Sequence, residues 1–380
     1  MKVIIVGGGI SGLLLATQLS SFYEEVIIFE SKTNKLGTPQ NKHLHVLLKK
    51  GQDIFFDFFP EYLSVFRKDC PVIDWAKDTK WESIAGRFPR YNSKIETFSF
   101  SRNYFEKILY SIIQEKKNIQ LIEEKVTNLI FEKMNIIGVS TKTKEFHATR
   151  VFICGGAHFP LKKLLEGKYI FHERVKKINI TYRSSIYSMD NFQHKDCKQY
   201  YSQLILPHTK EGLVQMPIED EQYINTEIFY KINRKKIHNT FNFEFTKKIV
   251  FRRKMPKMNG LIILGDSLCS LNPVYGQGMT VAFMQVKKIC DNINLQDYKL
   301  QKKISQLNLI PWLLSNLSFQ KKVNFLNLYL LTFYEKCISS RTVHQNFLNI
   351  LHLEGDYYNL FDLSVLCKAL IKNFYDRKIK

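Results

Sequence analysis

The chain has 380 residues, 45% of them hydrophobic and 24% charged, which is typical of a globular protein with one large or two medium domains. The formal net charge is +21, but the excess is mostly lysine, scattered singly or in pairs and triples. We interpret it as a solvated surface and expect no nucleic-acid partner, and attraction to an anionic lipid or ligand stays the alternative.

The cysteines are widely spaced and form no CxxC pair, so we expect no metal site, no disulfide framework and a reducing, cytoplasmic location. Cys154 and Cys269 lie in apolar, strand-like contexts that predict buried thiols. The apolar stretch 323–334 covers only about three helical turns between charged residues, which is too short to span a bilayer. Peripheral contact with a membrane stays open.

The first thirty residues predict a strand–turn–helix–strand unit. The β-branched run Lys2–Val6 leads into GGGISG at 7–12, a GxGxxG match, and then into a segment with helical periodicity. A second β-branched run, Val26–Phe29, ends in Glu30. This is the pattern of a Rossmann-like dinucleotide-binding unit.

Each residue of this motif has a physical role in holding a dinucleotide. Gly7 allows the tight turn, Gly9 lets the backbone approach a pyrophosphate, and Gly12 allows close contact between helix and strand. The helix N-terminus, which includes Ser11, offers free N–H groups and a positive dipole end to the phosphates. Glu30 is expected to accept hydrogen bonds from a ribose diol.

A second signature follows the run GLIIL at 260–264, which predicts another buried strand. Gly265 and Asp266 come directly after it, and PVYGQG follows at 273–278. The proline gives this loop a rigid entry, and its glycines permit close approach to a flat ring.

Together these segments resemble the GD motif and the PxxGxG loop of the FAD-dependent monooxygenases related to p-hydroxybenzoate hydroxylase. The resemblance implies that Gly265 and Asp266 bind the ribityl and pyrophosphate region of FAD. It also implies that the loop passes the isoalloxazine ring and opens a helix whose dipole stabilises negative charge on the flavin. The cofactor-binding residues of the loop are then Pro273, Gly276, Gly278 and Met279.

Further segments resemble the branch of this family that contains bacterial polyketide epoxidases and similar hydroxylases. QNKHLHVLLKKG at 40–51 resembles a QxxHxHxLLxxG segment beside the flavin, which makes His43 and His45 candidate cofactor contacts. Two surface histidines are the alternative. We expect the two side chains to differ in role, because nearby glycine and proline residues favour an irregular loop.

Arg102 resembles the arginine of an SRxxxE segment that contacts FAD, and an ion pair with Glu106 on the same helix is the alternative. The segment 216–219 resembles a PxE strand of the branch, and 352–370 resembles its C-terminal helical cap.

The segment after the strand 150–154 departs from the family pattern. Relatives carry Asp-Gly or Gly-Arg-x-Ser here, implicated in binding FAD and NAD(P)H, whereas this chain has GGAH at 155–158. The outer motifs can still hold FAD. We predict weakened docking of NAD(P)H, the expected reductant, and a separate reductase becomes a candidate partner.

These features predict an α/β fold with a Rossmann-like, glutathione-reductase-type FAD-binding domain, an antiparallel β-sheet substrate domain and a helical C-terminal cap. The expected FAD-binding domain is discontinuous and covers 1–70, 95–165 and 245–295. The expected substrate domain covers 70–95 and 170–245, with strands at 178–187, 200–206, 212–217 and 223–229. The C-terminal helical region covers 300–380.

The resemblance implies an FAD- and NAD(P)H-dependent monooxygenase that hydroxylates or epoxidises a lipophilic small molecule with O₂, through a flavin C4a-hydroperoxide in a dry pocket. Two alternatives stay open: an isoprenoid reductase or cyclase that does not use O₂, and a catalytically degenerate FAD-binding protein. The WxWxIP signature of halogenases is absent, which disfavours that branch. The sequence nominates no catalytic acid or base.

Overall fold

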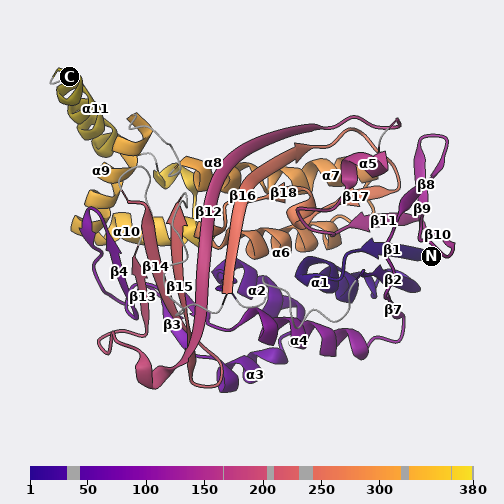
Figure 1. Ribbon diagram of the computed structural model, residues 1–380, viewed down its shortest axis with the longest axis horizontal. Helices are drawn as coiled ribbons and strands as arrows, with labels where there is room; N and C mark the ends of the chain where they lie inside the picture. The colour runs from indigo at the N-terminus through magenta and orange to yellow at the C-terminus, as the bar shows by residue number, and fades with distance from the viewer. Residues whose placement is uncertain are drawn as a thin grey trace.

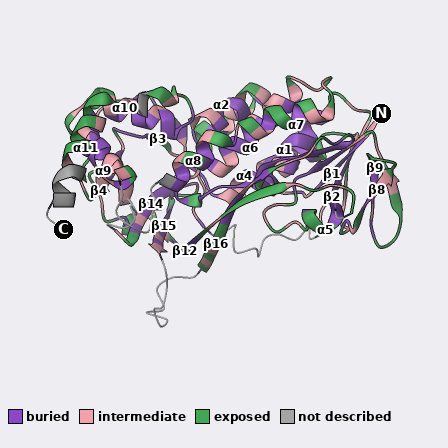
Figure 2. Cartoon of the chain, turned by 90° about the horizontal axis from the view of Figure 1, so that it is seen from above, coloured by how far each residue is buried: buried purple, intermediate pink, exposed green. Residues whose placement is uncertain are grey.

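A parallel sheet and a larger antiparallel sheet lie along the long axis of the molecule, and most helices cover one side of them (Figures 1 and 2). The C-terminal helices lie at the end opposite the N-terminus (Figure 1). The computed structural model describes residues 1–31, 43–165, 167–202, 209–230, 243–317, 325–360 and 362–378.

The parallel sheet is the Rossmann-like unit that the sequence predicts. Its central strands are β-branched and almost wholly buried, as expected for strands covered on both faces. Helix α1 (Ile10–Leu19) connects the strands β1 and β2. The strand order is β17 (Leu261–Ile263), β11 (Arg150–Ile153), β1 (Lys2–Val6), β2 (Glu25–Phe29) and β7 (Ile119–Ile122).

The second sheet has eight strands and is antiparallel except where β13 pairs with β4. Three of the four predicted strands fall inside its strands. The fourth, at 200–206, is a strand only to residue 202, and 203–206 lie outside the described residues. The strand order is β18 (Cys269–Ser270), β16 (Phe243–Lys254), β12 (His172–Ser188), β15 (Gln222–Tyr230), β14 (Glu211–Ile218), β13 (Gln199–Ser202), β4 (Thr79–Ser83) and β5 (Gly86–Arg87).

Strand β16 is a feature that the sequence analysis did not predict. It pairs antiparallel with β12 over most of its length, and β12 itself is 17 residues long. The predicted boundary at residue 245 assigned this segment to the FAD-binding domain. Because β16 is bonded into the antiparallel sheet, we propose that this boundary lies after Lys254.

Two small sheets and the remaining helices complete the fold, and the predicted α/β class with a helical C-terminal cap is confirmed. The small sheets contain β8 (Asn128–Glu132), β9 (Asn135–Ser140) and β10 (Glu145–His147), and β3 (Val72–Asp74) with β6 (Glu96–Phe98). The helices are α2 (Lys49–Phe58), α3 (Tyr62–Asp69), α4 (Arg102–Gln114), α5 (Leu161–Leu165), α6 (Gln277–Cys290), α7 (Asp297–Gln306), α8 (Leu309–Leu317), α9 (Phe325–Ser339), α10 (Arg341–Leu351) and α11 (Leu363–Lys378).

One arginine ties the parallel sheet to the helix behind it. At the start of β11, the Arg150 guanidinium lies 2.6 Å from the Asp297 carboxylate and donates to the carbonyl oxygens of Ile293 and Leu295. Both charged side chains are largely buried, at 15% and 12% exposure. Asp297 also accepts from the Gly260 N–H, 2.6 Å away, just before β17. Removing the arginine would therefore leave a buried carboxylate without its charge partner.

We expect Arg150→Met to lower the free energy of unfolding by about 3 kcal/mol, because removing one partner of a buried ion pair leaves the other charge buried and unpaired. The control is Arg183→Met, since Arg183 pairs with a Glu244 side chain that is 53% exposed. That loss should be about 1 kcal/mol or less. Urea unfolding of both variants measures the difference, and equal losses would contradict this account of Arg150.

Candidate functional site

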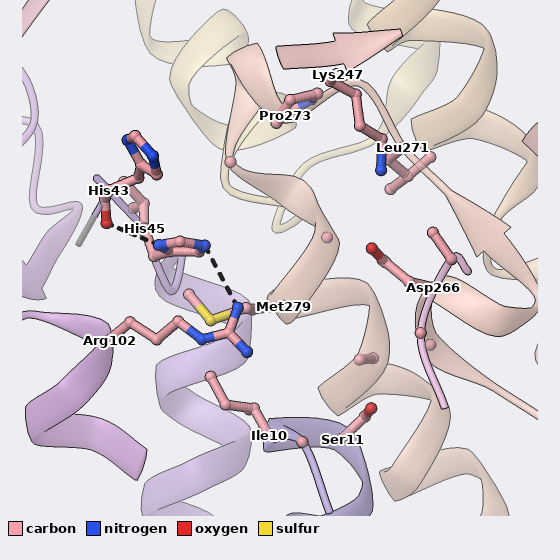
Figure 3. Close-up of a pocket in the computed structure, with 18 of the residues that line it drawn as sticks. Ile10, Ser11, His43, His45, Arg102, Lys247, Asp266, Leu271, Pro273 and Met279 are labelled. Atoms are coloured by element: carbon pink, nitrogen blue, oxygen red, sulfur yellow. Dashed lines mark hydrogen bonds between the residues drawn. The ribbon is translucent and has the colours of Figure 1, made fainter. Parts of the chain in front are cut away.

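A cavity of about 660 Å³ lies between the carboxyl ends of the parallel strands and one face of the antiparallel sheet. Its size is in the range of small-molecule and cofactor sites. Both predicted nucleotide-binding signatures line it, although they stand at opposite ends of the FAD-binding segments. Figure 3 shows Ile10 and Ser11 at one side of the cavity, Asp266 at another, and Pro273, Lys247 and Leu271 farther along.

The glycines of the first motif hold the turn and leave space in front of it. Gly7 has a φ of +108°, and a Cβ atom there would lie 2.5 Å from the Cys154 carbonyl oxygen. A Cβ atom on Gly12 would lie 1.9 Å from the Gly7 oxygen, whereas one on Gly9 would meet nothing within 4 Å. Gly7 and Gly9 line the cavity, and Gly12, predicted as a cofactor contact, is not among its lining residues. Gly12 therefore serves the turn itself.

The acidic residue of the motif and the second signature meet at the same place. Glu30 follows β2, lines the cavity and accepts a hydrogen bond of 2.8 Å from the Gly8 N–H. Gly265 has a φ of +60° and approaches Ser11 so closely that a Cβ atom would lie 3.0 Å from its Oγ atom. Asp266 is exposed and lines the cavity. The two signatures thus form one continuous wall.

The second signature ends in a helix whose N-terminus faces the cavity. Residues 273–275 form a short 3₁₀ turn, and Gly276 adopts a left-handed φ of +64° before α6 begins. No side chain caps α6, so its first N–H groups remain available to a ligand. Pro273, Gly276, Gly278 and Met279 all line the cavity. This cradle of open glycine positions and helix N-termini fits the pyrophosphate and ring of a flavin dinucleotide.

The two histidines and the arginine from separate segments converge beside this wall, as Figure 3 shows. His45 Nδ1 bonds the His43 carbonyl oxygen at 2.8 Å, and His45 Nε2 lies 3.4 Å from Arg102 Nη1. Arg102 Nε also bonds Glu106 at 2.9 Å. Arg102 therefore both lines the cavity and forms the ion pair with Glu106, so the two interpretations of this residue do not exclude each other. His43 bonds Ser184 of the antiparallel sheet instead, at 2.9 Å.

The electrostatics of this cluster keep His45 neutral. Burial, followed by the Arg102 charge, lowers the pKa of His45 from 6.5 to about 3. Its Nδ1–H donates to the His43 carbonyl oxygen, and its Nε2 lone pair accepts from the guanidinium. Burial also lowers the pKa of His43, and these two histidines are not the surface residues of the alternative interpretation. Because their ring nitrogens have different partners, the predicted difference between them has a structural basis.

The altered segment also reaches the cavity. Residues 155–160 line it, and the Gly156 carbonyl oxygen accepts a hydrogen bond of 3.0 Å from Ser267 Oγ. The exposed His158 is the ionisable side chain of this segment. The segment offers neither a carboxylate nor a guanidinium where relatives are expected to carry one. Weakened docking of NAD(P)H stays a prediction, and the segment on which it rests lines the same cavity as the two nucleotide-binding signatures.

The antiparallel sheet contributes residues that the sequence analysis did not nominate. Alternate side chains of six neighbouring strands face the cavity, and most are apolar or aromatic. The period-2 alternation could have separated them from the other face once the strand order was known. They are Trp81, Gln199, Tyr201, Val214, Met216, Thr226, Ile228, Tyr182, Phe245 and Lys247.

Among the residues that the structure describes, no set of three or more His, Cys, Asp or Glu side chains is placed to hold a metal ion. In the same residues, no helix combines the length and apolar character needed to cross a membrane. Cys154 and Cys269 are buried and free, as predicted.

Comparison with known proteins gives two family matches: squalene epoxidase over residues 214–357, and glucose inhibited division protein A over 94–183. Mouse squalene monooxygenase is 23% identical over 320 residues, which cover 75% of this chain and 53% of that protein. The chain covers only 31% of another curated relative. It thus spans about half or less of the curated relatives that it matches.

Two solved structures resemble the whole chain. The flavin-dependent brominase Bmp2 has a TM-score of 0.68 at 13% identity and covers 100% of both chains. The p-nitrophenol 4-monooxygenase PnpA of Pseudomonas putida DLL-E4 has a TM-score of 0.68 at 12% identity and covers 93% of this chain and 98% of its own. The predicted resemblance to FAD-dependent monooxygenases is thereby confirmed, and FAD is supported as the cofactor. Placement in the polyketide epoxidase branch stays a prediction.

We expect Gly9→Val to lose most of the bound FAD while the protein still folds. A Cβ atom there meets no protein atom within 4 Å, and we expect the rest of the valine side chain to enter the space in front of the turn. Gly12→Ala is the matched comparison, because its Cβ atom would clash with the Gly7 oxygen at 1.9 Å and should disrupt folding itself. Flavin absorbance and circular dichroism separate the two effects. Full flavin retention by Gly9→Val would show that the pyrophosphate lies elsewhere.

The depressed pKa of His45 predicts a stability loss in acid. Between about pH 6.5 and pH 3, the unfolded chain binds a proton at His45 that the folded chain excludes, so stability falls as the pH falls. We expect His45→Gln to make the free energy of unfolding less steep in this window, by about one proton at most. Denaturant titrations at several pH values measure the slope. An unchanged slope would mean that folded His45 takes up its proton normally.

Proposed function

We propose that this chain, which has the fold of the FAD-dependent monooxygenases, hydroxylates or epoxidises a lipophilic small molecule. One observation carries the proposal: the two FAD signatures and the apolar face of the antiparallel sheet line a single cavity. A substrate held on that face would lie beside the flavin-binding loop. NAD(P)H and O₂ are the proposed co-substrates, and a cytoplasmic location and peripheral membrane contact stay predictions from the sequence.

The residues that would hold FAD follow from the cavity wall. Gly9, Ser11 and the start of α1 would bind the pyrophosphate, and Glu30 would bind the ribose. Asp266 would bind the ribityl chain, and the uncapped N-terminus of α6 would face the ring edge. When bound, FAD supplies the electron transfer and oxygen activation that the side chains themselves cannot perform.

The protein's own contribution is orientation and exclusion of water. Leu271, Met216 and Ile228 offer apolar contact to a substrate, and burial of that substrate removes water from the reacting centre. Arg102 keeps a positive charge at the cavity wall, fixed by Glu106 and by the neutral His45. This arrangement can stabilise negative charge without offering a proton from His45.

Oxygen consumption tests the proposed reaction. Purified protein loaded with FAD should consume O₂ when NAD(P)H and a member of a lipophilic substrate panel are present, and the product should gain one oxygen atom from ¹⁸O₂. Anaerobic turnover with a saturated or cyclised product would instead support the isoprenoid reductase or cyclase. Bound FAD without turnover under either condition would support the degenerate flavoprotein.

We expect NAD(P)H alone to reduce the flavin slowly, because residues 155–158 lack the charged groups of relatives. One lost charge-assisted contact can weaken nicotinamide binding by about one to two decades. The rate should rise when substrate is bound or a separate reductase is supplied. Stopped-flow absorbance of the oxidised flavin is the measurement. Fast reduction by NADH or NADPH without substrate would contradict the prediction and remove the need for a partner reductase.

A further inference from the structure

Buried polar atoms without partners lie at the end of the cavity farthest along the antiparallel sheet. Among the described residues, Trp81 Nε1 and both side-chain polar atoms of Gln199 belong to residues that line the cavity, and Thr79 Oγ1 belongs to a neighbouring residue that does not. Their residues are 4%, 0% and 2% exposed, respectively. A buried polar group without a partner is costly, and such groups in folded proteins are usually satisfied by a water, an ion or a ligand.

Strand register brings these atoms into one patch. In the parallel pair β4–β13, Thr79 stands opposite Gln199 and Trp81 stands opposite Tyr201. Side chains two residues apart on a strand share a face, so all four residues lie on the same face of the sheet. Trp81, Gln199 and Tyr201 line the cavity. β4 and β13 are more than a hundred residues apart in the sequence, and these side chains become neighbours only when the two strands pair.

The surroundings of the patch are aromatic and uncharged. The Trp81 ring packs against Tyr201 at 4.7 Å, Phe88 at 5.4 Å and Phe347 at 5.5 Å between centroids. The charged residues of β4 are engaged elsewhere: Lys80 faces Asp196, and Glu82 pairs with Arg87. A ligand group here would therefore meet hydrogen-bonding partners but no charge.

The patch is also linked to the flavin-binding loop. The Tyr201 hydroxyl, whose ring touches Trp81, lies 3.5 Å from the carbonyl oxygen of Val274. Val274 belongs to the 3₁₀ turn that precedes Gly276. A molecule held at Trp81 and Gln199 would thus have its other end in the apolar part of the same cavity, beside that loop.

We propose that Trp81 and Gln199 anchor a neutral polar head group of an otherwise apolar substrate, such as an amide or a hydroxyl. The indole N–H can only donate, whereas the glutamine amide both donates and accepts. The matching group must accept at least one hydrogen bond and donate another, which excludes a pure hydrocarbon as the preferred ligand. That this ligand is a substrate rests on the proposed monooxygenase function. That the site binds a neutral polar group does not depend on that function.

Two shape-matched probes test the anchor: biphenyl-4-carboxamide and 4-isopropylbiphenyl. Calorimetry on the full chain measures the Kd of each probe, once with FAD bound and once without it. We expect the amide to bind at least about tenfold more tightly than the hydrocarbon, the worth of one or two net hydrogen bonds. Equal affinities, tighter binding of the hydrocarbon, or no detectable binding of the amide would overturn the proposal.

Gln199→Leu should abolish the preference for the amide without lowering thermal stability, because it removes two buried unpaired atoms. Gln215→Leu is the matched control. Gln215 is also buried with an unpaired Oε1, but it is not among the residues lining the cavity, and it should keep the preference. Trp81→Phe, which retains the ring and loses the N–H, is the second variant should Gln199→Leu fail to fold.

The outcomes separate the two hypotheses. Retained preference in both Gln199→Leu and Trp81→Phe would overturn the anchor even if the protein consumes oxygen. Conversely, absence of bound FAD or of oxygen uptake would refute the proposed function, and a selective, Gln199-dependent affinity for the amide would still support the anchor.

Discussion

The contact of backbone against backbone at the carboxyl ends of β1 and β11 is the constraint on which the rest of the site depends. Gly7 lies so close to the Cys154 carbonyl that no side chain fits between them, and Gly12 presses α1 against Gly7 in turn. This packing aims the start of α1 at the cavity and places Glu30 and Gly265 beside it. Without it, the two nucleotide-binding signatures would not form one wall.

The long strands β12 and β16 extend this arrangement to the substrate side. They carry the antiparallel sheet from the neighbourhood of the parallel sheet toward the C-terminal helices (Figure 1). His43 bonds Ser184 on β12, while His45, two residues later, bonds Arg102 at the start of α4. A short loop therefore couples the proposed cofactor wall to the sheet. A shift of the sheet would therefore be transmitted through this loop to Arg102 and the cofactor wall, because both hydrogen bonds are partly or fully buried.

The sequence predicted the parts of the molecule that are encoded locally. The turn, helix and strand of the first motif follow from about thirty adjacent residues, and the second signature from about twenty. The sequence does not predict β16, because two pairs of basic residues, Lys247–Lys248 and Arg252–Arg253, interrupt its apolar pattern. Phe245 and Phe251, an even number of residues apart, are the remaining trace of strand alternation. The Trp81–Gln199 patch could not be predicted, because it depends on the register of two strands joined across more than a hundred residues.

The two halves of the cavity differ in whether their polar side chains have hydrogen-bond partners within the protein. At the cofactor side, Glu30, Arg102 and His45 all have protein partners, so that wall is organised before any ligand arrives. At the sheet side, His43 Nε2, the Tyr182 hydroxyl and the atoms of Trp81 and Gln199 are buried without partners among the described residues. Selection for stability alone would replace such groups with apolar side chains, because each unpaired group costs about 1–3 kcal/mol. Unpaired buried groups also occur away from the cavity, as at Gln215, so it is their position on the cavity face, where a ligand can reach them, that supports the proposed anchor.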